Sequence, residues 1–239
     1  AMAVAIRGAV DDPAFASLLT RLPDVGELFQ ERQPADPVAL NTARKKLQAA
    51  LYSKLSDFVD DILAKSSPEP YDPGAEQAGE RALRTALINL LAASGHDEAG
   101  ERLLGLYNAA TNMTEKLAAL RGLAGLEGAA RETALADFEQ DWKSNPLVMD
   151  KWFGVQAGTG DAATVSKLAA HPDFDMGNPN RVRSVAAAFA MQNLSGFHAP
   201  DGSGYEVIEG IILKADKVNP ALGARLLTAF EQWRILEPK

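Results

Sequence analysis

Hydrophobic positions recur at helical spacing along most of the chain. Between Asp36 and Lys65 the apolar residues fall three, four or seven positions apart, which places them on one face of a helix. Lys, Arg and Asp occupy the opposite face. The pattern predicts one long helix whose apolar stripe consists of Leu40, Leu47, Leu51, Leu55, Phe58 and Ile62.

Further stripes of the same period follow, and no run alternates with period two for long enough to predict a strand. The fold class is therefore predicted to be all-α, with about a dozen helices joined by short links. Alanine-rich interfaces favour an irregular superhelical array of antiparallel helix pairs, similar to HEAT or armadillo arrays, although no fixed repeat length is visible. The clearest later helices are expected over residues 147–156, 162–170, 182–191, 205–218 and 221–233.

Several helix starts are marked by an acidic residue or Asn followed by Pro, a pair that supplies a capping side chain and a first helical residue without an N–H. These starts are Asp12-Pro13, Asp36-Pro37, Asn145-Pro146 and Asn219-Pro220. Residues 66–74 contain three Pro and one Gly, which predicts a surface connection. We expect a single helical domain over residues 1–239 with a candidate internal break near 66–74.

Composition supports helices, because 46% of the residues are hydrophobic and only 7% are aromatic. The absence of Cys excludes disulfides and thiolate metal sites, and it fits a reducing, cytoplasmic location. A net charge of -8 opposes binding to nucleic acid or anionic lipid. No apolar run approaches the roughly 20 residues that span a bilayer, so no membrane association is expected.

The sequence offers no complete set of catalytic residues. A zinc hydrolase typically needs two His one helical turn apart with a Glu between them, whereas His96, His171 and His198 lie in three separate segments. Gly202-Ser203-Gly204 lacks the surroundings of a nucleophile and is interpreted as a turn with Ser203 as a helix N-cap. The chain is therefore predicted to have no catalytic residues and no metal site of its own.

Arginines carry the most informative polar pattern. An Asn-capped start at Asn178 delivers Arg181 and Arg183, whose side chains point in nearly opposite directions on a helix. One is expected to form ion pairs within the domain while the other projects into a groove. Arg225 lies in an apolar run, where a guanidinium needs a partner or an aqueous cavity. The heaviest expected core residues are Trp142, Trp152, Phe153 and Trp233.

Four strings occur in a characteristic order: Asn112-Met113-Thr114 with Leu117–Leu120, Leu147–Phe153, Asn178–Ser184, and Phe197-His198-Ala199 with Asp201–Tyr205. Together they resemble the C-terminal helical domain of bacterial aminopeptidase N, a zinc-dependent gluzincin alanyl aminopeptidase family. The strings include Trp152, Asn178, Asn180, Arg181, Asp201, Ser203 and Tyr205 as motif or structural residues.

The resemblance implies a parent of four domains, in which a β-rich domain, a thermolysin-like zinc domain and a small β-domain precede this one. The zinc ligands and the catalytic residues would all lie upstream of residue 1. In the family this helical domain caps the catalytic domain and encloses a cavity that admits short peptides. Two cavity-facing Arg positions of the family fall on Arg183 and Arg225. The family's domain is longer at both ends, so the chain is expected to be a fragment of it.

The expected function is therefore that of a non-catalytic domain whose partners are the parent's catalytic and small β domains and a peptide substrate. The parent would remove N-terminal residues, preferring small or basic ones, with zinc-activated water. Two alternatives remain open: a free-standing helical-repeat adaptor that binds another protein, and a domain of an inactive paralogue.

Overall fold

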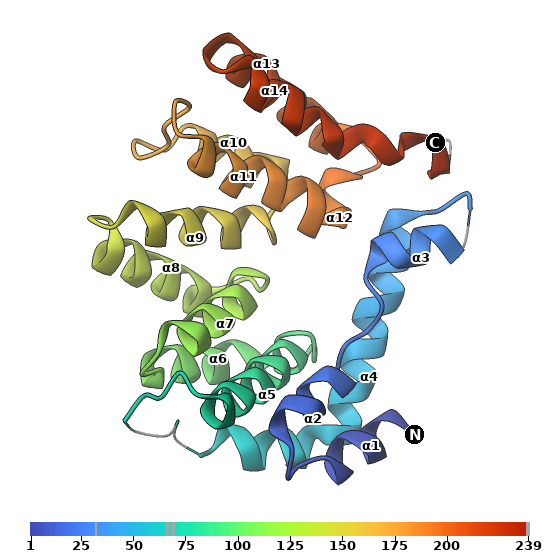
Figure 1. Ribbon diagram of the computed structural model, residues 1–239, viewed down its shortest axis with the longest axis vertical. Helices are drawn as coiled ribbons and strands as arrows, with labels where there is room; N and C mark the ends of the chain where they lie inside the picture. Colours follow the sequence, from blue (N-terminus) through green and yellow to red (C-terminus); the bar gives the residue numbers. More distant parts are fainter. Residues whose placement is uncertain (32, 66, 68–69, 238–239) are drawn as a thin grey trace. The chain divides into compact units, whose positions relative to one another are not determined.

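The computed structural model describes residues 1–239 except 32, 66, 68–69 and 238–239 (Figure 1). The all-α prediction is confirmed, since the described residues form 14 α-helices and one 3-10 helix. Their only β-pairing is an isolated bridge between Ala35 and Leu236. Within the described residues, none of the helices combines the length and the apolarity needed to cross a membrane.

The chain divides into two compact units. Unit 1 comprises Ala1–Pro23 and Ala43–Leu135, and unit 2 comprises Asp24–Thr42 and Ala136–Lys239. Helices of unit 1 are α1 (Met2–Gly8), α2 (Pro13–Leu19), most of α4 (Pro37–Leu63), α5 (Ala75–Ala92), α6 (Ala99–Ala109), α7 (Met113–Ala124) and the first half of α8 (Ala129–Trp142). Unit 2 contains the remainder of α4 and α8, with α3 (Val25–Glu31), α9 (Pro146–Ala157), α10 (Ala162–Ala169), α11 (Pro179–Gln192), α12 (Leu194–Phe197), α13 (Ser203–Val218), α14 (Pro220–Leu226) and the 3-10 helix η1 (Leu227–Ile235).

Residues 66, 68 and 69 of the predicted break at 66–74 lie outside the described residues. The described part of this segment connects α4 to α5 within unit 1. A single helical domain over residues 1–239 stays a prediction.

The predicted caps, each followed by Pro, are confirmed. The side chains of Asp12, Asn145 and Asn219 each accept a hydrogen bond from a backbone N–H of the first helical turn. Asp36 does the same at the start of α4, where its carboxylate accepts from the backbone N–H groups of Val38 and Ala39. These short-range signals position the helices because the capping atom lies only two or three residues before its donor.

Unit 1 is held by close packing of α2 on α5 and of α7 on both α5 and α6. Small residues permit the close approach: a Cβ added to Gly122 of α7 would lie 3.1 Å from the Cβ of Ala92. Similarly, a Cβ added to Gly79 of α5 would lie 3.2 Å from the Cβ of Ala14. The core behind these contacts contains Leu83, Leu87, Leu90, Leu91, Leu103, Leu120 and Leu123.

Unit 2 is built on the packing of α9 against α11, with α13 and α14 paired beside them. Gly204 of α13 permits the tightest contact, because a Cβ there would overlap with the carbonyl oxygens of Gly196 and Phe197. Segment 24–42 completes the unit: the backbone N–H of Ala35 donates to the carbonyl of Ile235 at 2.8 Å, and Phe29 packs into the same small core.

Three expectations about particular residues are wrong. Leu47 is 51% exposed and therefore does not belong to the buried stripe of α4. Trp233 is 65% exposed, because it lies on η1, none of whose residues is buried. The helix expected over 221–233 instead changes from α to 3-10 geometry after Leu226.

Candidate functional site

Asn178 fixes the start of α11. Its side-chain oxygen accepts hydrogen bonds from the backbone N–H groups of Asn180 at 3.0 Å and Arg181 at 3.3 Å, and Pro179 is the first helical residue. This cap sets the register of α11, which determines where the two following arginines point.

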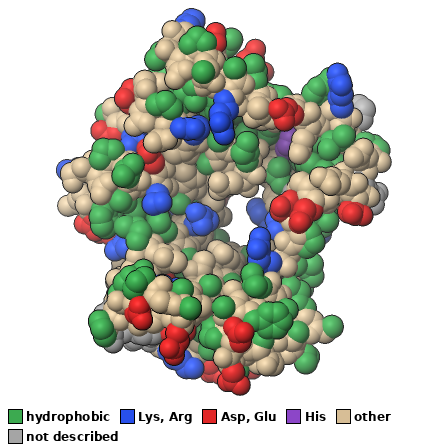
Figure 2. Space-filling view, viewed as in Figure 1, with side chains coloured by type: hydrophobic (Ala, Val, Ile, Leu, Met, Phe, Trp, Pro, Cys, Tyr) green, Lys and Arg blue, Asp and Glu red, His purple; other side chains and the backbone are tan. Residues whose placement is uncertain are grey.

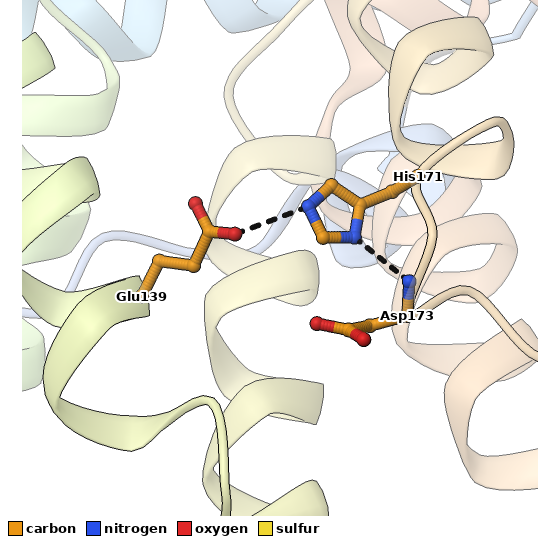
Figure 3. Close-up of side chains that lie close together, drawn as sticks. All are labelled: Glu139, His171 and Asp173. Carbon is orange, nitrogen blue, oxygen red and sulfur yellow. Dashed lines mark hydrogen bonds and ion pairs between the residues drawn. The ribbon is translucent and has the colours of Figure 1, made fainter.

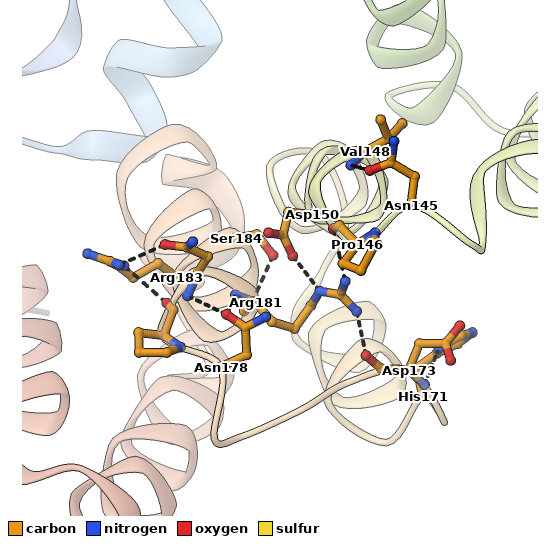
Figure 4. Close-up of polar contacts among 12 residues, drawn as sticks. Asn145, Pro146, Val148, Asp150, His171, Asp173, Asn178, Arg181, Arg183 and Ser184 are labelled. Carbon is orange, nitrogen blue, oxygen red and sulfur yellow. Dashed lines mark hydrogen bonds and ion pairs between the residues drawn. The ribbon is translucent and has the colours of Figure 1, made fainter.

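Arg181 is buried and bonded on every side (Figure 4). Its Nε lies 2.6 Å from a carboxylate oxygen of Asp150, which belongs to α9. Nη2 donates to the carbonyl of Pro146 at 3.2 Å, and Nη1 donates to the carbonyl of Asp173. The guanidinium also stacks 4.4 Å from the ring centre of Phe153. Arg181 therefore joins α9, α11 and the α10–α11 connection, which is a structural role.

Arg183 points to the other side of α11, as Figure 4 shows. Its exposed guanidinium is held over its own helix, where Nε donates to the carbonyl of Pro179 at 3.0 Å and Nη2 donates to the side chain of Asn180 at 2.9 Å. Nη1 makes no hydrogen bond to the described residues. The ion pair expected of one of the two arginines is present at Arg181, and Arg183 is exposed on the other side of the helix. Projection of Arg183 into a groove stays a prediction.

Arg225 lies on α14, which packs against α11. Its side chain is exposed, so the guanidinium in this otherwise apolar run reaches solvent within unit 2 rather than an internal acid. The cavity-lining role of Arg183 and Arg225 stays a prediction.

The expected N-cap at Ser203 is wrong. Gly202, with a φ of 77°, precedes α13, and Ser203 is the first helical residue. The carboxylate of Asp201 accepts the backbone N–H of Ser203 at 3.0 Å and its hydroxyl at 2.7 Å. These bonds, the hydroxyl's first, lower the pKa of Asp201 below its ordinary value. The capping carboxylate thus comes from the residue before the glycine.

Tyr205, in the first turn of α13, belongs to an aromatic cluster. Its hydroxyl lies 2.7 Å from Nδ1 of His198, and its ring packs edge-on to Phe197 with centroids 5.1 Å apart. Partial burial raises the pKa of the Tyr205 phenol. The neutral phenol is therefore the form that this cluster favours.

Trp152 is a core residue, as predicted, and is 6% exposed. Its ring lies edge-on to Phe153 at 5.1 Å and 5.4 Å from the ring of His171. This aromatic contact positions the imidazole of His171 at the end of α10, beside Glu139.

Glu139, His171 and Asp173 are the described side chains that come nearest to a metal-binding group, with ligand atoms all within 4.8 Å of one another (Figure 3). Nδ1 of His171 accepts the backbone N–H of Asp173 at 3.1 Å, so it offers a lone pair there. Nε2 then carries the proton and donates to Glu139 at 3.2 Å. A metal ion would need a free lone pair on the ring, and both ring nitrogens of His171 are already hydrogen-bonded. The arrangement is therefore a hydrogen-bonded link between α8 and the α10–α11 connection.

The zinc that the resemblance implies does not fit the residues described here. A catalytic zinc site holds three protein ligands around an open position, often with a carboxylate-oriented imidazole. His96 is an exposed turn residue, and His198 bonds to Tyr205, so neither joins His171 in a common site. No catalytic step is assigned to this chain.

Sequence reasoning missed the buried ion pair of unit 1. Arg84 of α5 and Glu115 of α7 lie 3.0 Å apart, with side chains only 9% and 4% exposed. The sequence did contain a signal for a buried arginine: Arg84 directly follows Leu83 in an apolar segment, just as Arg225 lies in an apolar run. What the sequence lacks is the identity of the partner 31 residues away.

Comparison with known proteins assigns the fold family. The whole chain, residues 1–239, matches the family described as "Domain of unknown function (DUF3458_C) ARM repeats". The chain belongs to this family. The armadillo-like class predicted from the sequence is confirmed by this match.

Two curated relatives are aminopeptidases. Aminopeptidase N of Caulobacter vibrioides is 38% identical over 240 residues, covering 98% of this chain and 28% of the relative. Aminopeptidase N of Escherichia coli is 35% identical over 220 residues, covering 90% of this chain and 25% of the relative. The resemblance to aminopeptidase N is thus confirmed, and the chain spans less than a third of these relatives' length.

A solved structure is similar as well. Legionella pneumophila aminopeptidase A, crystallised in complex with aspartic acid, superposes with a TM-score of 0.83 at 28% sequence identity. The match covers 98% of this chain and 29% of that protein. Fold and sequence therefore point to the same group of enzymes.

Proposed function

We propose that this chain is a non-catalytic domain of a zinc aminopeptidase, one that caps the catalytic domain, lines its internal substrate cavity and limits entry to short peptides. The observation that carries the proposal is similarity to aminopeptidase N along 98% of this chain, at 38% identity, but along only 28% of the relative. The rest of such an enzyme would supply the zinc and its ligands, and metal-activated water would attack the peptide there.

The arrangement of Arg183 supports a part in substrate selection. An exposed guanidinium whose Nε and Nη2 are anchored on its own helix is preorganised, while Nη1 remains available to a carboxylate. A peptide's C-terminal carboxylate is the group that this remaining donor nitrogen would bind. Arg225, exposed on the neighbouring α14, would supply a second guanidinium to the cavity wall.

The reading frame upstream of residue 1 provides the first test. A His-Glu-x-x-His sequence there supports the proposal, and a degenerate version would identify an inactive paralogue. A native start at Met2 with no such motif upstream would establish a free-standing helical-repeat adaptor instead.

Kinetics of the longer enzyme test the role of the arginines. Arg183→Ala and Arg225→Ala should each lower kcat/KM for tetrapeptides by about tenfold, the value of one charge-assisted hydrogen bond, and leave single-residue amides nearly unchanged. Arg121→Ala, an exposed arginine of unit 1, serves as the matched control. Equal losses on peptides and amides would show that the arginines act on structure alone.

A further inference from the structure

A pocket in unit 1 is lined by both apolar and charged residues. It encloses about 270 Å³ between the α1–α2 connection, the end of α4 and helix α5. Four apolar residues line it: Val10, Pro13, Ile62 and Leu83. Because small-molecule pockets usually begin near roughly 300 Å³, this one suits a ligand no larger than a single amino acid.

Arg84 forms the buried polar wall of this pocket, and the residue as a whole is 7% exposed. Its Nε donates to Glu115 at 3.0 Å, and Nη1 donates to the carbonyls of Ile62 at 2.9 Å and Lys65 at 2.7 Å. These bonds lock the orientation of the guanidinium. Nη2 makes no hydrogen bond to the described residues, so donors remain for a ligand.

Two further charges of opposite sign line the same pocket. Lys65 follows the end of α4, and Glu80 lies on α5. Neither forms an ion pair or a side-chain hydrogen bond with the described residues. The pocket thus presents two cations, one anion and an apolar wall within about 270 Å³.

We propose that this pocket binds a free aliphatic α-amino acid, such as leucine. Its carboxylate would accept from Nη2 of Arg84 and from Lys65, its ammonium would donate to Glu80, and its side chain would cover Leu83 and its apolar neighbours. A zwitterion places an opposite charge against each of the three charged side chains. An inorganic anion would be repelled by Glu80, and a simple cation would be repelled by Arg84 and Lys65. A neutral apolar molecule would leave the three charges unused.

Calorimetric titration of the 239-residue chain tests the proposal. L-Leucine should bind with a dissociation constant on the order of 1 mM, since the pocket is small and open. Leucine amide lacks the carboxylate and N-acetyl-leucine lacks the ammonium, so each should bind about tenfold more weakly. The dipeptide Leu-Leu separates the two charges and should be weakened similarly.

Two variants on α5 supply the matched comparison. Glu80→Gln should weaken leucine binding about tenfold, and Glu76→Gln, one turn earlier and outside the pocket, should leave it unchanged. Circular dichroism should show equal helicity for both. Absence of saturable leucine binding at about tenfold above 1 mM would overturn the proposal, as would equal binding of leucine and leucine amide or tighter binding of the dipeptide. These outcomes do not depend on peptidase activity, so the proposed function is tested separately.

Discussion

Each unit has a buried arginine at a junction of helices, Arg181 in unit 2 and Arg84 in unit 1, and the surroundings of these two guanidinium groups differ. Arg181 in unit 2 uses Nε, Nη1 and Nη2 on Asp150 and two backbone carbonyls, and its face is covered by Phe153. Arg84 in unit 1 is paired with Glu115 and with two carbonyls at the end of α4, but Nη2 keeps its donors and a pocket lies beside it.

The difference separates a buried guanidinium whose three nitrogens are all hydrogen-bonded from one that keeps donors beside a pocket. Because all three of its nitrogens are hydrogen-bonded, Arg181 is a structural clamp. Arg183, two residues along the same helix, has the exposed guanidinium instead. Incomplete bonding beside a pocket makes Arg84 a candidate for recognition. In the space-filling view, acidic, basic and hydrophobic side chains are mixed over the visible face (Figure 2), so surface charge alone does not identify either arginine.

Removing the acid that pairs with Arg181 should have the largest effect. Asp150→Ala leaves a buried guanidinium without its anion and should lower the free energy of unfolding of unit 2 by about 3–5 kcal/mol. Urea unfolding followed by tryptophan fluorescence measures this directly, because Trp142, Trp152 and Trp233 all belong to unit 2.

Arg183→Ala is the control for this clamp, since its guanidinium is exposed. It should change the free energy of unfolding by less than about 0.5 kcal/mol. Similar losses for the two variants would contradict the division of roles on α11.

Local signals in the sequence predicted much of this region, and tertiary contacts supplied the rest. The Asn178 cap and the opposite directions of Arg181 and Arg183 follow from residues only two to five positions apart. The partners of Arg181 do not: Asp150 lies 31 residues away, and the carbonyl of Asp173 becomes an acceptor only when the α10–α11 connection folds over α11.

The wrong expectations have the same origin. Trp233 was expected in the core because it is large and apolar, yet η1 leaves it exposed. Ser203 was expected to cap α13, but the positive φ of Gly202 lets Asp201 reach the first turn instead. The spacing of hydrophobic residues along the chain predicts neither the change to 3-10 geometry after Leu226 nor the turn at Gly202.

A single capping carboxylate in unit 2 should have a smaller effect than the buried pair. Asp161 caps α10, where it accepts the backbone N–H and the hydroxyl of Thr164, each at 2.8 Å. Asp161→Ala should therefore cost about 1 kcal/mol at pH 7. Asp161→Asn keeps an acceptor and should remain close to the wild type.

The effect of Asp161 should also depend on pH. The bonds from Thr164, the backbone one first, lower the pKa of Asp161 in the folded protein. Its ionised form therefore stabilises the fold above the unfolded-state pKa of about 3.9, and this contribution is lost as the pH falls through the lower folded value. Fluorescence-monitored unfolding at pH 7 and below pH ~4 should show the Asp161→Ala difference shrinking. A constant difference would contradict the charged cap.

We propose that this chain is a domain of an aminopeptidase and that it performs no hydrolysis by itself. The most direct measurement is an assay of the purified 239-residue chain on an aminoacyl-nitroanilide, with and without added zinc. We expect no release of nitroaniline above the buffer rate under either condition. Zinc-dependent turnover that is abolished by a chelator would contradict the claim.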